Sequence, residues 1–412
     1  MQKPSKLAQI PQIRFAGFTD PWERRKLGEV ADIVGGGTPS TAISEYWDGD
    51  IDWYAPAEIS DQIFVNSSQR KITTEGLINS SAKILPVGTI LFTSRAGIGK
   101  TAILAKESCT NQGFQSIIPH KKELDSYFIF SRTEELKRYG ETVGAGSTFV
   151  EVSGKQMSNM NLMMPSLAEQ TKIGELFANL DNLITLHQRK VEKLQKIKKS
   201  CLQNLFPQNN QNTPKIRFKN FSDEWVENKY KNIGQCLSGG TLSYEDLDKN
   251  GIYKCILYGE LYTRYDYIIK NIVFRTNKLG NKVIKNDILF PQSTTVDAMS
   301  LISPACMNDD EAQTSGVFAI RPHKNIDGNF ITYYTKGNFY QRNKLAKNAQ
   351  GLTIVHLYYQ SIKDETILIP NLAEQCKISD FFSKLDKLIT LQQRKVEKLK
   401  NIKKALLNKM FI

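Results

Sequence analysis

The chain has 412 residues, of which 40% are apolar and 24% are charged, and a formal net charge of +13. This composition predicts a soluble protein of two or three domains, because no apolar run approaches the roughly 18 residues needed to span a bilayer. The basic excess favours a polyanionic partner, nucleic acid first, although acidic protein subunits would also fit.

Six scattered cysteines form no Cys-x-x-Cys pair, which indicates neither a zinc knuckle nor a disulfide framework. The first 15 residues lack the apolar core of a signal peptide. We therefore expect a reduced, cytoplasmic protein.

Residues 1–164 are predicted to form a first globular domain of mixed α and β structure. The runs 51–59, 82–94 and 113–120 are typical of strands, and 124–140 is typical of a helix. Loops such as "GGGTPS" and "TSRAGIGKT" are rich in Gly, Ser and Thr beside basic residues. Such side chains supply the hydrogen-bond donors and acceptors that meet base edges and phosphates.

The stretch "SRAGIGKTAIL" at 94–104 raises the possibility of a phosphate-binding loop, since Gly99 and Lys100 match the end of that motif. Its first glycine is replaced by Ser94, and the segment that follows has room for only about two helical turns. An autonomous NTPase is therefore a minor alternative, which ATP hydrolysis abolished by Lys100→Ala would support.

Residues 165–207 are predicted to form one long helix. Pro165 opens it, Glu169 lies in its first turn, and lysines fill its last turns. Its apolar residues follow a 3,4 spacing that is typical of a coiled-coil seam. Over 189–199, six basic residues against Glu192 give a charge of +5. Those side chains face either solvent along a coiled coil or a phosphate backbone or acidic partner.

Residues 208–369 are predicted to form a second mixed domain, with strands in 251–261, 283–292 and 316–323 and a helix in 329–346. A second long helix follows over 370–412, and its residues 394–404 again carry +5. Neither domain contains a convincing catalytic or metal-binding constellation, and the four histidines lie far apart in the sequence.

The chain is an internal duplication. Residues 165–206 align without a gap on 370–411, with 26 identities in 42 positions at an offset of 205. Residues 13–38 match 216–241 at an offset of 203, and "GSTFVEVS" from Gly146 matches "GLTIVHLY" from Gly351. With the shared "ILF" as anchor, "SRAGIGKTAIL" corresponds to "PQSTTVDAMSLI", and Lys100 has no counterpart there. We therefore expect two related binding sites that recognise different targets.

The simplest packing partner for each long helix is the matching helix of the other repeat. If a pseudo-twofold axis relates the repeats, the two helices pair antiparallel. His187 and Gln392 occupy the same seam position and would then lie close together. They would either set the register of the pair or face water at a kink.

The order of globule, "LAEQ…LD.LI" helix, globule and similar helix resembles the DNA specificity subunit of type I restriction-modification enzymes. The resemblance covers essentially the whole chain and is carried by "PSLAEQTKIGELFANLDNLI", its copy "PNLAEQCKISDFFSKLDKLI", the "LGEVADIVGGGTPS" opening and "GSTFVEVSGKQMSNMNLMMPSLAEQ". The second opening departs from the first, with "CLSGGTLSYED" in place of "IVGGGTPSTAI".

The resemblance implies a non-catalytic subunit with two target recognition domains, each reading one half of an asymmetric bipartite DNA sequence. The helices would fix the spacing and dock methyltransferase and restriction subunits. S-adenosylmethionine, ATP and magnesium would serve those partner subunits and none would bind this chain. The alternative is a coiled-coil adaptor that binds proteins without reading DNA.

The resemblance also directs attention to particular side chains. In the first domain we expect DNA contacts from Thr93, Ser94, Arg95, Lys100, Ser147 and Thr148, and in the second from Gln292, Ser293, Thr294, Thr295 and Thr353. On the helices, the residues expected to face a DNA backbone or a partner are Arg189, Lys190, Lys193, Arg394, Lys395 and Lys398. The competing explanation is that the loop residues are ordinary polar residues on the surface and that the helix residues are the solvated flank of a coiled coil.

Overall fold

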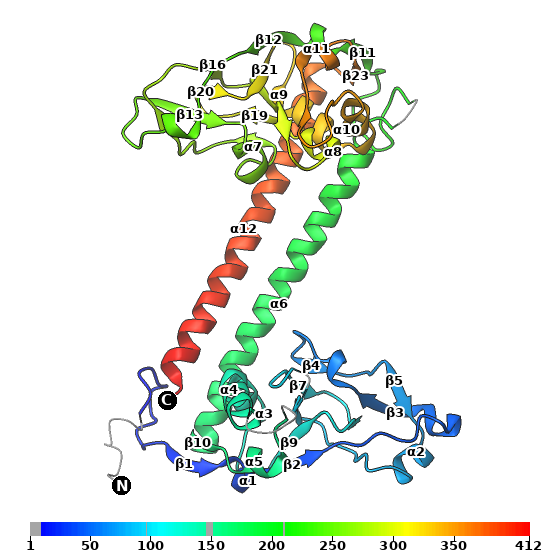
Figure 1. Cartoon of the computed structure of the whole chain (residues 1–412), viewed down its shortest axis with the longest axis vertical. Coiled ribbons are helices and arrows are strands. Elements are labelled where there is room, and N and C mark those ends of the chain that lie inside the picture. Colours follow the sequence, from blue (N-terminus) through cyan, green and yellow to red (C-terminus); the bar gives the residue numbers. More distant parts are fainter. Residues whose placement is uncertain (1–9, 96, 146–150, 209–210) are drawn as a thin grey trace. The chain divides into compact units, whose positions relative to one another are not determined.

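A computed structural model describes residues 10–95, 97–145, 151–208 and 211–412. The chain divides into two compact units (Figure 1), unit 1 being Met1–His187 with Lys395–Ile412 and unit 2 being Gln188–Arg394. Each unit therefore combines the globular part of one repeat with helix segments from both repeats. Among the described residues, no helix is long and apolar enough to cross a membrane.

The core of unit 1 is a five-stranded sheet in the order β2-β9-β6-β7-β4. A three-stranded sheet, β5-β3-β8, and the antiparallel pair β1-β10 complete its strands. The strands span Glu23–Lys26 (β1), Ala31–Gly35 (β2), Trp47–Tyr54 (β3), Phe64–Val65 (β4), Arg70–Ile72 (β5), Ile90–Phe92 (β6), Thr101–Leu104 (β7), Cys109–Thr110 (β8), Gln115–Pro119 (β9) and Asn161–Met164 (β10). Every residue of β6 and β7 is buried, as expected for strands covered on both faces.

Short helices pack around this sheet. They span Leu27–Val30 (α1), Thr74–Ile78 (α2), Ser126–Ser131 (α3), Thr133–Gly144 (α4) and Gly154–Ser158 (α5). Side chains cap several of them: Asp125 accepts the Phe128 N–H at the start of α3, and Ser153 does the same for Gln156 at α5. The helix predicted over 124–140 is thus a pair of helices that meet at Arg132.

Unit 2 repeats this architecture. Its five-stranded sheet has the order β12-β21-β17-β19-β14, which matches that of unit 1 strand for strand, and β11-β23 corresponds to β1-β10. A four-stranded sheet, β15-β13-β20-β16, and the small ribbon β18-β22 complete the unit. The duplication therefore extends through the globular parts, where the sequences have diverged.

The strands of unit 2 span Val226–Lys229 (β11), Gly234–Ser238 (β12), Tyr253–Leu257 (β13), Ile268–Ile269 (β14), Arg275–Thr276 (β15), Asn281–Ile284 (β16), Ile288–Pro291 (β17), Ser293–Thr294 (β18), Ala305–Met307 (β19), Glu311–Ser315 (β20), Val317–Pro322 (β21), Val355–His356 (β22) and Thr366–Ile369 (β23). Its short helices span Glu260–Thr263 (α7), Ala298–Leu301 (α8), Gly328–Thr332 (α9), Phe339–Ala346 (α10) and Tyr359–Ile362 (α11). A π-helical turn over Tyr333–Gly337 joins α9 to α10 within the predicted helix 329–346.

The two long helices are α6, Leu167–Asn204, and α12, Leu372–Met410. In unit 1 the end of α12 lies against the first half of α6, since Phe411 stacks on Phe177 at 5.9 Å and Lys403 pairs with Asp181 at 2.6 Å. The higher-numbered residue of the α12 end, Phe411, contacts the lower-numbered residue of α6, Phe177, so the two helices run in opposite directions. The predicted antiparallel pairing is therefore confirmed in this unit.

Unit 2 contains the equivalent contacts at an offset of 205 residues. Phe206 stacks on Phe382 at 5.9 Å, and Lys198 pairs with Asp386 at 2.6 Å. Each hydrophobic core is thus completed by the end of the helix that belongs to the other repeat. Phe206 is fully buried among the aromatic residues Trp225, Phe330 and Tyr334.

The polar side chains at the helix starts also recur in both units. Arg14 forms two 2.7 Å hydrogen bonds with buried Glu169, and Arg217 does the same with buried Glu374. These bidentate pairs hold the segment that leads into each globule against the first turn of its long helix. The proximity of His187 and Gln392, which belong to different units, stays a prediction.

Candidate nucleic-acid interface

The loop at 93–100 connects the antiparallel strands β6 and β7. Gly97 and Gly99 have φ angles of +107° and +93°, which glycine adopts without steric cost. The Thr93 hydroxyl donates to the Gly97 carbonyl at 2.7 Å and accepts from the Lys100 N–H at 2.9 Å. Because Lys100 leads into a strand, the loop lacks the helix N-terminus that a phosphate-binding loop provides.

Thr93 and Ser94 are fully buried, so the prediction that their side chains face DNA is wrong. Both residues continue β6 into the interior of the domain. The Ser94 N–H donates to the Gly113 carbonyl at 2.8 Å, and its carbonyl accepts from the Val152 N–H at 3.0 Å. Their role is to fix the start of the loop.

Ile98 and Gly99 of the loop pack against α4. Ile98 is 7% exposed, and a Cβ added to Gly140 of α4 would lie 3.0 Å from it. A Cβ on Gly99 would lie 2.9 Å from the Lys137 backbone. This close approach holds Arg95, which is half-buried, and Lys100, which is exposed, on a rigid base.

Two further predicted contacts of unit 1, Ser147 and Thr148, lie outside the described residues. They therefore stay predictions. Glu151, the first described residue after them, forms a backbone bridge with Arg95. Glu151 itself therefore lies beside the 93–100 loop.

Unit 2 has the same arrangement of backbone contacts. The Gln292 N–H donates to the Gly316 carbonyl at 3.1 Å, and its carbonyl accepts from the Leu357 N–H at 3.0 Å, as for Ser94. Ser293 pairs with His356 in the ribbon β18-β22, just as Arg95 pairs with Glu151. The alignment anchored on "ILF" is confirmed, and Arg95 and Ser293 occupy equivalent positions.

The predicted residues of unit 2 differ in exposure. Gln292 and Ser293 are half-buried, whereas Thr295 and Thr353 are exposed. Thr294 is only 9% exposed, and its hydroxyl accepts from the Val296 N–H at 3.3 Å. Thr294 therefore shapes the turn, and the prediction that it faces DNA is wrong.

The six basic residues predicted on the helix faces, Arg189, Lys190, Lys193, Arg394, Lys395 and Lys398, are all exposed. Lys198 and Lys403 differ from them, because each makes a 2.6 Å ion pair with a helix aspartate. Part of the +5 charge of each segment thus holds the helices together. The exposed remainder is available to an external partner.

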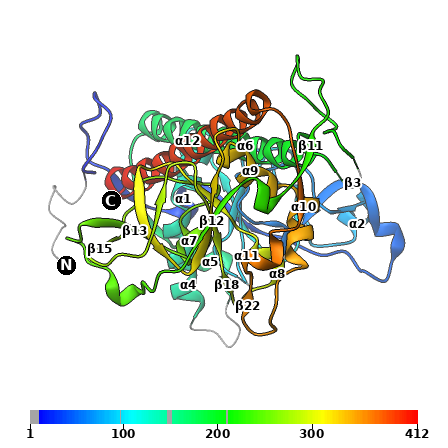
Figure 2. The same ribbon diagram turned by 90° about the horizontal axis from the view of Figure 1, so that it is seen from above.

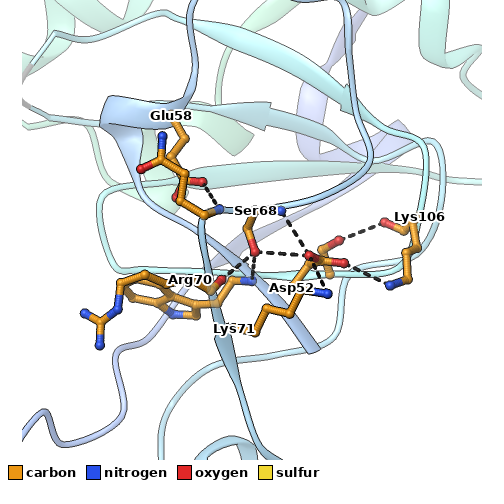
Figure 3. Close-up of polar contacts among 9 residues, drawn as sticks. Asp52, Glu58, Ser68, Arg70, Lys71 and Lys106 are labelled. Carbon is orange, nitrogen blue, oxygen red and sulfur yellow. Dashed lines mark hydrogen bonds and ion pairs between the residues drawn. The ribbon is translucent and has the colours of Figure 1, made fainter. Parts of the chain in front are cut away.

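A buried carboxylate lies in the small sheet of unit 1 (Figure 3). Asp52 of β3 is 1% exposed and accepts from the Ser68 N–H at 3.0 Å and from Lys106 Nζ at 2.9 Å, with Lys71 Nζ at 3.7 Å. Burial alone would raise the pKa of Asp52, but these hydrogen bonds outweigh it and hold the pKa below its ordinary value. Asp52 therefore ties three separate segments of the domain together.

The role of Asp52 is not apparent in the amino-acid sequence, since its hydrogen-bonding partners Ser68 and Lys106 lie 16 and 54 residues away. No local motif marks such a cluster. Among the described residues, no group of three His, Cys, Asp or Glu side chains is placed to hold a metal ion.

Comparison with known proteins decides the family. The family model for the type I restriction modification DNA specificity domain matches residues 19–196 and again residues 222–401. The chain belongs to this family. As a specificity subunit it is a non-catalytic component of a type I restriction-modification system.

Relatives agree with this assignment. The MjaIX specificity subunit of Methanocaldococcus jannaschii is 27% identical, over 94% of this chain and 92% of its own length. A type I restriction enzyme specificity subunit of Escherichia coli is 30% identical over 39% of this chain and 41% of its own length. The solved specificity subunit of M. genitalium shares the fold, with a TM-score of 0.61 at 14% identity, over 98% of this chain and 99% of that one.

Proposed function

We propose that each unit of this specificity subunit reads one half of an asymmetric bipartite DNA target. One observation carries this proposal. The two units share a sheet order and the same backbone anchors for the 93–100 and 292–297 loops, yet the equivalent side chains differ. A guanidinium at Arg95 and a hydroxyl at Ser293 present different hydrogen-bonding groups, which is what two unlike half-sites require.

The long helices are proposed to dock the methyltransferase and restriction subunits. Exposed apolar residues recur at the same positions of both repeats, Leu183 with Leu388, Leu186 with Leu391 and Ile197 with Ile402. At about 100° per residue, Leu183 and Leu186 lie on one face of α6, and Leu388 and Leu391 lie on the corresponding face of α12. An apolar stripe beside exposed lysines suits a partner with an apolar, acidic surface.

The chemistry of the complex is assigned to those partners. S-adenosylmethionine would serve the methyltransferase subunits, and ATP and magnesium the restriction subunits, in the cytoplasm. This chain would supply only the recognition of the DNA sequence at which those subunits act. Leu186→Asp should then weaken methyltransferase binding, whereas Ile78→Asp, on the similarly exposed α2, should leave it unchanged.

Sequencing methylated adenines in cells with and without the chain tests the proposal directly. We expect one bipartite motif to lose methylation when the chain is absent and to regain it on complementation. Identical methylation in both strains, in cells that contain the partner subunits, would contradict the proposal and favour an adaptor without sequence reading.

A further inference from the structure

Leu352 is fully exposed at the tip of a short loop in unit 2, with a relative exposure of 101%. The loop spans residues 350–356 and is closed at its base by two backbone hydrogen bonds between Gln350 and His356, of 2.9 and 2.7 Å. Val355 and Leu357 anchor the far side of the loop in the hydrophobic core of the unit. The loop is therefore a constrained turn.

The conformation of Gly351 keeps the loop in this shape. Its φ angle is +111°, and a Cβ at this position would lie 2.1 Å from the Ile354 carbonyl oxygen. Only glycine allows so close a return of the backbone. Because the turn is fixed in this way, Leu352 is held outward in solvent.

Other exposed groups surround this tip. In the ribbon β18-β22 (Figure 2), Thr294 pairs with Val355, so the residues after Thr294 run beside those before Val355. Val296 is 71% exposed and Ile354 is 48% exposed. The hydroxyl residues Thr295 and Thr353 are exposed in the same two loops. An apolar tip flanked by hydroxyl groups results.

The charge of this surface is compatible with DNA. Residues 292–296 and 350–356 contain no carboxylate, which phosphates would repel. The carboxylate of Asp297, which follows them, is exposed and accepts the Ser300 N–H at 2.6 Å at the start of α8. The two segments also contain no arginine or lysine, so the guanine contact open to Arg95 in unit 1 is not open here. Apolar side chains read DNA by packing on the 5-methyl group of thymine in the major groove.

We propose that Leu352 contacts the methyl group of a thymine in the second half-site and thereby contributes to its recognition. The proposal rests on the proposed function, since it requires unit 2 to bind DNA. Uracil lacks the 5-methyl group of thymine, so the proposed contact with Leu352 would be lost when uracil replaces that thymine.

A double-mutant cycle between protein and DNA tests this contact. The chain is assembled with its methyltransferase subunits, and binding is measured on the target defined by methylation sequencing. Each thymine of the second half-site is replaced in turn by uracil. One of these replacements should weaken DNA binding by the wild type about fourfold, which corresponds to the burial of one methyl group. The same replacement should leave DNA binding by Leu352→Ala unchanged.

Leu279→Ala is the matched control, because Leu279 is 70% exposed in another loop of the same unit. It should respond to uracil as wild type does. Leu352→Ala should unfold at the wild-type temperature, since a fully exposed side chain has no packing to lose.

The proposal is overturned if no uracil replacement weakens wild-type binding, or if Leu352→Ala remains as sensitive to uracil as wild type. Loss of affinity without any uracil effect, together with increased reactivity of unstacked bases, would instead make Leu352 a wedge between base pairs. Failure of the proposed function is distinguishable, because wild-type complex would then not prefer the target over scrambled DNA.

Discussion

Arg95 and Ser293 place different chemistry at the same point of two similarly built loops. A guanidinium can donate two parallel hydrogen bonds to a guanine edge, whereas a serine hydroxyl has only one O–H group to donate. Arg95 lies on a loop fixed by Thr93 and by α4, so little conformational freedom is lost when it binds. The first half-site should therefore depend strongly on this one side chain.

Arg95→Ala should weaken target binding by about 1–3 kcal/mol, the usual worth of a bidentate contact to guanine. The measurement is fluorescence anisotropy of the assembled complex on target and scrambled duplexes. Arg24→Ala, which removes an exposed arginine from β1, is the control and should leave binding unchanged. Equal losses on both duplexes would show that Arg95 contacts a phosphate rather than a base.

Asp52 is a second residue with a testable consequence. Asp52→Asn should destabilise unit 1 by about 1–3 kcal/mol at pH 7, because the charged hydrogen bonds from Ser68 and Lys106 are lost. The folded-state pKa of Asp52 is below its ordinary value, so this stabilisation is complete above about pH 4 and is lost as pH falls through the folded-state pKa.

Chemical denaturation at pH 7, 5 and 3.5 checks this prediction. The difference in unfolding free energy between wild type and Asp52→Asn should be equal at the two higher pH values and smaller at pH 3.5. Asp61→Asn, which removes an exposed carboxylate, should show no such pattern. A difference that grows on acidification would contradict the lowered pKa.

At the scale of single residues, the sequence predicted the loop but not the direction of its side chains. Thr93 and Ser94 are polar and follow an apolar strand, which suggested a surface position. They are buried because segments distant in sequence cover them: Ser94 is hydrogen-bonded to the backbones of Gly113 and Val152, and Thr93 forms a backbone bridge with Phe114. Polarity alone could not reveal that the Thr93 hydroxyl and the Ser94 backbone find partners inside the domain, or that the Ser94 hydroxyl is buried with no hydrogen-bond partner among the described residues.

At the scale of elements, α6 and α12 are joined to both globular parts by matching polar contacts. Asp181 accepts from the Tyr127 hydroxyl at 2.9 Å and from Lys403. Asp386 accepts from the Tyr333 hydroxyl at 2.7 Å and pairs with Lys198. Burial, reinforced by the neighbouring aspartate, raises the pKa of both tyrosines, so both remain protonated donors.

Asp181→Asn should release the end of α12 from unit 1, at a cost of about 1–3 kcal/mol. Hydrogen exchange should become faster over residues 400–411. Asp386→Asn should have the corresponding but smaller effect over 195–206, since the Asp386 side chain is 28% exposed against 8% for Asp181. Asp380→Asn, whose carboxylate is 71% exposed on the same helix, serves as the control and should change neither segment.

The repeat in the sequence was sufficient to predict both helices and their antiparallel pairing, because the 205-residue offset is visible in identical residues. It was not sufficient to predict that Phe411 packs on Trp22 and Phe128. A pattern of apolar residues shows that a helix end will be covered, but not which globule covers it. That depends on long-range packing between residues nearly four hundred positions apart.

At the scale of the whole molecule, each hydrophobic core draws on two distant parts of the chain. Deleting residues 405–412 removes Leu406, Leu407, Met410 and Phe411 from the core of unit 1. The loss should fall on unit 1 alone and should exceed the roughly 3–5 kcal/mol that truncating one large buried side chain costs. Hydrogen exchange should therefore increase over residues 10–187 and remain unchanged over 211–394.

Removing Ile412 alone is the control for this deletion, since that residue is 42% exposed. It should leave exchange in both units at the wild-type rate. If the larger deletion instead loosened unit 2, the assignment of residues 395–412 to unit 1 would be wrong.

The two units are completed at different times while the chain is being synthesised. Residues 188–394 of unit 2 are synthesised before residues 395–412, which unit 1 needs to complete its core. At about 5–20 residues per second, translation from position 187 to 395 takes roughly 10–40 s. For that time the aromatic surface around Trp22, Phe128 and Phe177 has no cover from Phe411. The earlier-made globule thus becomes complete after the later one, and the nascent chain is open to chaperone binding at its first domain throughout that interval.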